Sequence, residues 1–217
     1  MNKRKTSSEK DIKKAYSNLS HVYGVFESIF ENNIRKKSLE LLDVRKGDRV
    51  LEIGFGTGYN LVELAKAVGD NGKVYGIDLT PEMVKITRKK LIKNNLLNRV
   101  KLIQGSATKL PFGRNSFNIV YVSNVLEILS DKDTKIVLKE IKRVLKPKGK
   151  ICVIDTSDNE NYNAVKFYIW LNKKFPSYTS YPINVPKFIK HSGLKIIRKD
   201  IINIIKFFPM QIVIAKK

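Results

Sequence analysis

The amino-acid sequence predicts an α/β fold in which helices cover both faces of a mostly parallel sheet. Three observations support this prediction. Short runs rich in Val and Ile recur along the chain, helical patterns separate them, and glycine-rich or polar segments follow them directly. Strands that are buried on both faces of a parallel sheet are apolar throughout rather than alternating. The first five runs, each predicted to be a parallel strand, are 50–53, 74–77, 100–103, 119–122 and 151–154.

Helical patterns connect these runs. Leu61–Val68 is expected to form the first crossover helix, and Pro81–Asn94 the second. Thr80 suits the N-cap of the second helix, because proline is favoured at the position that follows a cap. Asp131–Leu145 places its apolar residues on one face, and Pro147 comes shortly after its end. These elements complete the predicted alternation of strand and helix.

The pattern changes after residue 154. Asn161–Phe175 is predicted to be an aromatic-rich helix, and a shorter helix is expected to end at His191. Leu194–Ile205 and Met210–Ala215 are predicted to be the last two strands. Because only a turn separates these two strands, we expect them to form an antiparallel hairpin.

Length and composition indicate one globular domain. The chain has 217 residues, of which 42% are hydrophobic, and its apolar runs are too short to span a membrane. The basic N-terminus is not followed by an apolar segment, so we expect a cytoplasmic protein. Cys152 is the single cysteine, and His21 and His191 are far apart, so neither an internal disulfide nor a metal site is predicted.

The chain is strongly basic. It has 42 Lys and Arg residues against 20 Asp and Glu residues, which gives a formal net charge of +22. Such a surface attracts nucleic acid or an anionic membrane, although biased residue usage alone also produces it. The basic residues are spread along the chain, which favours a generally basic surface over one dedicated stripe. They lie mainly in segments 3–14, 85–101, 139–150 and 187–206.

A glycine-rich turn follows the first strand. Gly54, Gly56 and Gly58 alternate directly after Ile53, and Glu52 comes two positions before the first glycine. Glycine allows a sharp turn, and the free N–H groups of the helix that follows favour an anionic group. A dinucleotide fingerprint would place the third glycine one residue later, and a P-loop would end in Gly-Lys-Ser/Thr, so both are excluded.

The motif E-x-G-x-G-x-G after a strand resembles the first motif of class I S-adenosylmethionine (SAM) dependent methyltransferases. This resemblance implies a Rossmann-like, doubly wound sheet of seven strands, five parallel and then an antiparallel hairpin, with helices on both faces. It also implies that Glu52 and the glycine turn hold the methionine part of SAM. Asp78 follows the second strand, about 20 residues after the glycines, where an acidic side chain can accept both ribose hydroxyls.

Two later segments extend the resemblance. Residues 105–120 are similar to the family segment that flanks the adenine, with Ser106 where an aspartate is usual and Ala107 beside it. Serine accepts a hydrogen bond there without a charge. The segment after the fourth strand, which begins at Ser123, lacks the Asn-Pro-Pro-Tyr of base and glutamine methylases. It resembles the ubiquinone/menaquinone methylase-like group (methyltransferase type 11), as does Arg143–Gly149, in which Lys148 stands where glycine is common. The cofactor-binding residues implied by the resemblance are Glu52, Gly54, Gly56, Gly58, Asp78, Leu79, Ser106, Ala107 and Ser123.

The sequence indicates the catalytic residues less clearly than the cofactor-binding residues. Methyl transfer from a sulfonium mainly requires that the two reactants are positioned, but a C- or O-nucleophile also needs a base. His21 is the better placed candidate, because the segment around His21 and Tyr23 resembles the part of these enzymes that caps the cofactor. Tyr23 and Tyr121 could orient the substrate or simply line the site. His191 is expected at the surface.

We therefore expect a single SAM-dependent methyltransferase domain over residues 1–217. Residues 1–45 would form a helical cap, and residues 156–193 would form a variable insertion on the substrate side. The expected acceptor is a small or lipid-like molecule, of quinone or phospholipid type, with possible peripheral contact to an anionic membrane. An RNA methyltransferase and a non-catalytic SAM-binding module are the alternatives. The sequence does not indicate an oligomeric state.

Overall fold

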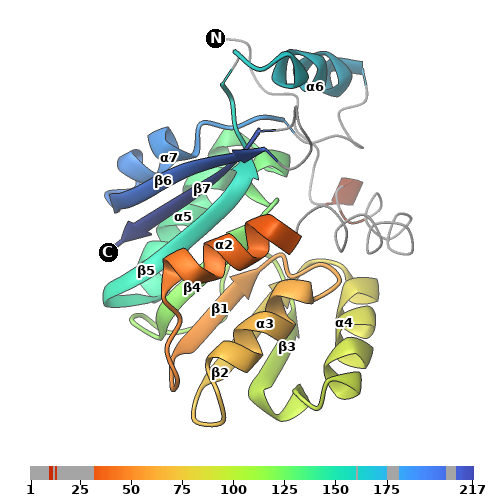
Figure 1. The fold of residues 1–217 in the computed structure, drawn as a ribbon, viewed down its shortest axis with the longest axis vertical. Coiled ribbons are helices and arrows are strands. Elements are labelled where there is room, and N and C mark those ends of the chain that lie inside the picture. The colour runs from red at the N-terminus through yellow and green to blue at the C-terminus, as the bar shows by residue number, and fades with distance from the viewer. Residues whose placement is uncertain (1–9, 12, 14–31, 160, 175–180, 204–208) are drawn as a thin grey trace.

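The computed structural model describes residues 10, 11, 13, 32–159, 161–174, 181–203 and 209–217 (Figure 1). This part of the chain forms a seven-stranded sheet with the order β3-β2-β1-β4-β5-β7-β6. The strands are β1 (Arg49–Ile53), β2 (Lys73–Asp78), β3 (Val100–Gln104), β4 (Phe117–Ser123), β5 (Leu145–Thr156), β6 (Lys195–Asn203) and β7 (Pro209–Lys216). The predicted strands and their order along the chain are confirmed.

Strands β1 to β5 are parallel to one another, and β7 is antiparallel to both β5 and β6. The predicted hairpin is therefore present, with β7 inserted between β5 and β6. Burial explains this placement. The β7 residues from Pro209 to Ala215 are all buried, whereas β6 carries charged, largely exposed side chains at Lys195, Arg198 and Lys199. A strand with an exposed, charged face suits a sheet edge, and an apolar strand suits the interior.

Helices cover both faces of the sheet. They are α2 (Asn32–Leu42), α3 (Tyr59–Ala67), α4 (Pro81–Lys93), α5 (Asp131–Val144), α6 (Asn163–Lys174) and α7 (Val185–His191), with short 3-10 turns at Leu97–Arg99 and Leu126–Ile128. In Figure 1, α2 and α3 lie in front of the sheet and α5 lies behind it. Side chains alternate accordingly along β4: Ile119 and Tyr121 join the core under α2, α3 and α4, and Val120 and Val122 join the core under α5 and α7.

Two turns show how the sequence sets the element boundaries. Ser130 caps α5, because its hydroxyl oxygen accepts a hydrogen bond from the Asp133 amide at 2.9 Å. Thr80 occupies the N-cap position of α4, as predicted, but its side chain makes no capping hydrogen bond. Lys148 adopts a left-handed backbone conformation with φ of +64° in the turn within β5, a conformation that favours glycine.

The described part of the N-terminal region includes α2, while residues 1–9, 12 and 14–31 of the predicted cap lie outside the described residues. Among the helices of the described part, none has both the length and the apolar character needed to cross a bilayer.

Candidate functional site

The expected cofactor residues gather at one edge of the sheet. The glycine turn follows β1, Asp78 ends β2, Ser106 and Ala107 follow β3, and Ser123 ends β4. These four strands are adjacent and parallel, so their carboxyl ends meet at the same edge. The chain crosses from one side of β1 to the other at this point, because β1 lies between β2 and β4. Open α/β sheets bind ligands at this topological switch point.

The three glycines of the turn all have left-handed backbones, with φ of +68° at Gly54, +51° at Gly56 and +80° at Gly58. Two of them also permit close approach to neighbouring side chains. A β-carbon on Gly54 would lie 2.3 Å from a methyl group of Val125, and one on Gly58 would lie 2.5 Å from the methyl group of Thr87. Both backbone conformation and space therefore require glycine here.

Asp78 fastens the glycine turn to the end of β2. One carboxylate oxygen accepts the Gly56 amide and the other accepts the Thr80 amide, each at 2.9 Å. The side chain is 9% exposed. Burial raises the pKa of Asp78 above its ordinary value, while the backbone amides act in the opposite direction.

Glu52 is the buried end of a polar chain that links β1 to two helices. Its carboxylate accepts the Asn60 side-chain amide at 3.0 Å, and the Asn60 oxygen accepts the Arg35 guanidinium at 2.8 Å. All three side chains are at most 5% exposed. Burying these groups is possible because each has hydrogen-bond partners. The acidic residue of the motif thus holds α2 and α3 against the strand that leads into the glycine turn.

The segment after β3 is organised by its own side chains. The Ser106 hydroxyl accepts the Thr108 amide at 3.1 Å and lies 2.7 Å from the Thr108 hydroxyl. The Gly105 amide donates to the Asp78 carbonyl at 2.9 Å, which ties the ends of β2 and β3 together. Ser106, Ala107 and Leu79 are all partly exposed, so each retains surface that a ligand could contact.

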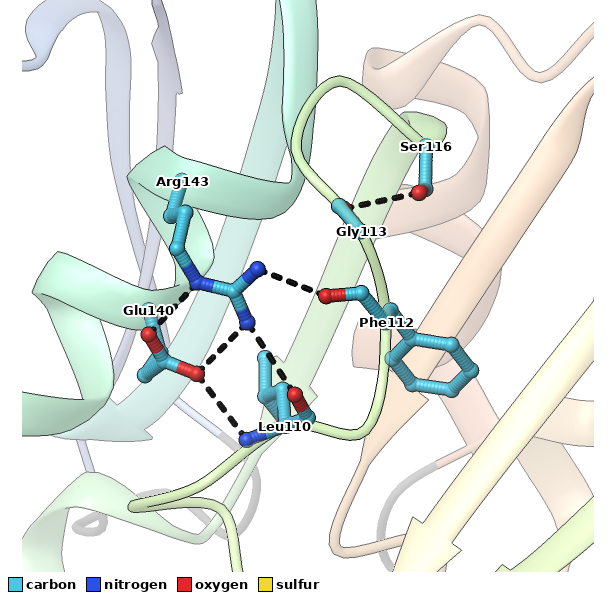
Figure 2. Close-up of polar contacts among 6 residues, drawn as sticks. All are labelled: Leu110, Phe112, Gly113, Ser116, Glu140 and Arg143. Atoms are coloured by element: carbon cyan, nitrogen blue, oxygen red, sulfur yellow. Dashed lines mark hydrogen bonds and ion pairs between the residues drawn. The ribbon is translucent and has the colours of Figure 1, made fainter.

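Figure 2 shows how the following loop is clamped to α5. Arg143 donates to the carbonyls of Phe112 at 2.6 Å and Leu110 at 3.0 Å, and it pairs with Glu140 through two bonds of 2.7 Å. Glu140 in turn accepts the Leu110 amide at 3.0 Å. The Arg143 hydrogen bond and charge hold the pKa of Glu140 below its usual range. This clamp fixes the loop that leads away from Ser106 and Ala107.

The expectation that Tyr121 orients the substrate does not fit its position. The side chain is fully buried under α2, where its hydroxyl lies 2.7 Å from the Ser38 hydroxyl. Ser38 donates its own hydrogen to the Arg35 carbonyl, so the Tyr121 hydroxyl is the donor in this pair. Burial raises the pKa of Tyr121 well above its ordinary value. The physical reason is strand alternation, which turns residue 121 toward the helix layer rather than toward the end of the sheet.

Of the other catalytic candidates, His21 and Tyr23 lie outside the described residues. His191 is exposed, as expected, and its ring nitrogen lies 2.7 Å from the Lys187 carbonyl.

Three further residues contribute to this edge of the sheet and were not predicted. The buried Thr87 hydroxyl on α4 donates to the Gly56 carbonyl at 2.9 Å and so supports the turn. Glu127 is 7% exposed and accepts the Thr156 amide at 2.6 Å, and Asp155 is fully buried near the end of β5. Asp155 follows an apolar run directly, as Asp78 does, so the same signal could have identified it. Thr87 carries no comparable signal.

Comparison with known proteins gives a consistent family assignment. Residues 50–149 match the methyltransferase domain family. The demethylmenaquinone methyltransferase of Lactobacillus johnsonii is 33% identical over 196 residues, covering 87% of this chain and 80% of that protein. The demethylmenaquinone methyltransferase of Geobacillus stearothermophilus is 37% identical over 166 residues, covering 75% and 70%.

Solved structures show the same fold. A SAM-dependent methyltransferase from Aquifex aeolicus superposes with a TM-score of 0.65 at 24% identity, covering 97% of this chain and 99% of that one. The geranyl diphosphate C-methyltransferase of Streptomyces coelicolor, solved with S-adenosyl-L-homocysteine, gives a TM-score of 0.72 at 13% identity, covering 86% and 79%.

Proposed function

The chain belongs to the class I SAM-dependent methyltransferases of the ubiquinone/menaquinone type, and on that premise we propose that it methylates a quinone-type acceptor. The chain is an enzyme, and its methyl donor is SAM. The proposal of a quinone-type acceptor rests on the similarity to a demethylmenaquinone methyltransferase, which extends over 87% of the chain. The match therefore includes regions outside the cofactor motif.

The residues at the edge of the sheet fit SAM. When bound, SAM supplies an electrophilic methyl group on a sulfonium. The site combines a buried carboxylate at the end of β2, a turn whose three glycines carry no side chains that would cover the backbone, and polar groups after β3. We assign the ribose to Asp78, the methionine part to Glu52 and the turn formed by Gly54, Gly56 and Gly58, and the adenine to Ser106 and Ala107. Leu79 and Ser123 complete the set.

In this assignment Glu52 chiefly positions other groups. Its carboxylate bonds to Asn60, so it anchors the first turn of α3 beside the glycine loop. Asp78 has a double task in this assignment, because it holds the Gly56 amide and would also accept a ribose hydroxyl. Preorganised acceptors of this kind position a reactant at little entropic cost.

We assign the acceptor to the side of the site formed by residues 156–193. In Figure 1, α6 lies beyond the carboxyl end of β5. Phe167 and Trp170 on this helix are 56% and 50% exposed, and their rings stack with centroids 5.8 Å apart. An exposed aromatic pair suits contact with an apolar ring or chain. His21 stays a predicted base, and Tyr23 stays a candidate to orient the substrate. The cytoplasmic location and contact with an anionic membrane also stay predictions.

The acceptor is tested by incubating the enzyme with methyl-labelled SAM and, separately, a reduced demethylated naphthoquinone, an anionic phospholipid and RNA. We expect label to appear in the quinone alone. Label in RNA alone or in phospholipid alone would identify that molecule as the acceptor in place of the quinone. SAM binding without label in any of the three would favour a non-catalytic module.

The ribose assignment has its own test, which is calorimetric titration of SAM into Asp78→Ala. We expect affinity to fall more than tenfold, because a charge-assisted hydrogen bond is lost. Asp78→Glu, which keeps the carboxylate, should lose less. Since Asp78 also fastens the turn, thermal unfolding of each variant must show that the protein is folded. A folded Asp78→Ala variant with unchanged affinity would refute the assignment.

A further inference from the structure

A second concave site lies in the helix layer that covers one face of the sheet. Helices α2, α3 and α4 enclose a hollow of about 490 Å³, within the range typical of small-ligand sites. Its walls come from all three helices, which are adjacent in Figure 1. The lining residues are Asn32, Arg35, Lys36, Leu39, Tyr59, Val62, Glu63, Lys66, Lys90, Lys93 and Asn94.

The charge of this hollow exceeds the general bias of the chain. Five of its lining side chains are basic and one is acidic, whereas the whole chain has 42 basic and 20 acidic residues. The single acidic side chain, Glu63, forms an ion pair with Lys66 at 2.9 Å. Bringing like charges to one concave surface costs electrostatic energy, which an anion bound among them would offset.

The floor of the hollow is preorganised. The Lys90 ammonium lies 3.0 Å from the centroid of the Tyr59 ring, and the Arg35 guanidinium lies 5.2 Å from it. Arg35 is further fixed by its hydrogen bond to Asn60. Two cations from different helices are thus held at one aromatic ring. Fixed cations bind an anion with a smaller loss of side-chain entropy than free surface lysines do.

We propose that this hollow binds the phosphate group of a phosphate ester, supplied either by an anionic lipid headgroup or by a free phosphorylated compound. An arginine and several lysines that line one hollow suit a phosphate, because both kinds of side chain donate charge-assisted hydrogen bonds to its oxygens. RNA is disfavoured by shape. Single-stranded nucleic acid needs a groove that follows several successive phosphates, whereas these cations surround one small hollow.

The site does not depend on the identity of the methyl acceptor. Arg35 reaches Glu52 through Asn60, so replacing Arg35 would also disturb the β1 end of the cofactor site. The test therefore uses three exposed lysines, one from each helix: Lys36→Gln, Lys66→Gln and Lys93→Gln combined. A matched control carries Lys132→Gln, Lys135→Gln and Lys139→Gln on the exposed face of α5, which lies across the sheet. Both triple variants lose the same charge from helical positions.

Three ligands are titrated at physiological salt: glycerol phosphate by calorimetry, vesicles of phosphatidylcholine with phosphatidylglycerol by co-sedimentation, and single-stranded RNA by filter binding. We expect the α2/α3/α4 variant to bind phosphate at least about tenfold more weakly, because three positive charges are removed from the hollow, and the α5 control to change little. Binding of vesicles but not glycerol phosphate identifies a lipid headgroup. Binding of glycerol phosphate but not vesicles identifies a free compound.

The proposal is overturned if the native protein binds neither phosphate source, or if both triple variants weaken binding equally, which would show a diffuse basic surface. RNA binding that only the α2/α3/α4 variant loses, without phosphate or vesicle binding, would also overturn it. Thermal unfolding checks that both variants fold. If the triple variant is unstable, Lys93→Gln alone, with Lys139→Gln as its control, provides the same comparison with a smaller effect.

Discussion

Replacing Arg143 with alanine should destabilise the protein and loosen the loop beside the expected adenine site. Arg143 makes four hydrogen bonds, two to backbone carbonyls and two to Glu140, and its side chain is 24% exposed. A hydrogen bond to a charged group contributes about 1.5–3 kcal/mol when it is buried, and water replaces part of it at a partly exposed site. We therefore expect a loss of about 3 kcal/mol in the free energy of unfolding, which would lower the midpoint of thermal unfolding by about 6–12 °C.

Urea unfolding measures this loss, and Arg198→Ala is the control. Arg198 forms an ion pair of 2.9 Å with Asp200 on the edge strand, and its side chain is 52% exposed. Exposed pairs of this kind contribute at most about 1 kcal/mol. If Arg143→Ala costs no more than Arg198→Ala, the clamp does not stabilise the fold. A folded Arg143→Ala variant should also bind SAM more weakly, because the loop that follows Ser106 and Ala107 is no longer fixed.

The pH dependence of the same variant gives an independent check. Arg143 lowers the pKa of Glu140 in the folded state, first through their hydrogen bond. A carboxyl whose folded pKa is lowered adds stability that is complete above its unfolded pKa, about 4.3, and is lost as the pH falls below that value. The difference in free energy of unfolding between the native protein and Arg143→Ala should therefore shrink under acid conditions. A difference that stays constant down to about pH 3 would contradict the pairing.

Two further substitutions test the fold. Tyr121→Phe should lower the free energy of unfolding by about 1 kcal/mol, measured with urea, because a buried hydrogen bond between two hydroxyls is lost. Turnover per folded molecule should stay the same. A tenfold loss of kcat without loss of stability would instead return Tyr121 to the catalytic residues. Lys148→Gly should gain about 0.5 kcal/mol, because relief of the left-handed strain slightly exceeds the entropic cost of glycine. Lys132→Gly within α5 should lose about 1 kcal/mol, and an equal loss at residue 148 would show that the turn carries no strain.

The sequence alone predicted the strands, the crossover helices, the cofactor family and the edge of the sheet at which the site forms. These features depend on local patterns. Runs of Val and Ile, caps and glycine spacing act on neighbouring residues, and parallel strands bring their carboxyl ends together whatever else surrounds them. The lysine at position 148, where glycine is common, was also visible in the sequence, and its left-handed backbone explains why glycine suits that position.

The tertiary structure decided what depends on contacts between distant segments. Strand β7 lies between β5 and β6 because it is more apolar than β6. Which of the two strands takes the interior position depends on the burial that the complete sheet provides. Asp78 and Glu52 were predicted as motif residues from the sequence, but their bonds to Gly56 and Asn60 arise from the packing of other elements. Tyr121 lies near the carboxyl end of β4, yet its side chain points to the face that α2 covers. Which helices cover each face of the sheet is decided only when the whole chain folds. The hollow between α2, α3 and α4 has the same origin, since its cations come from three separate helices and meet only in the folded chain.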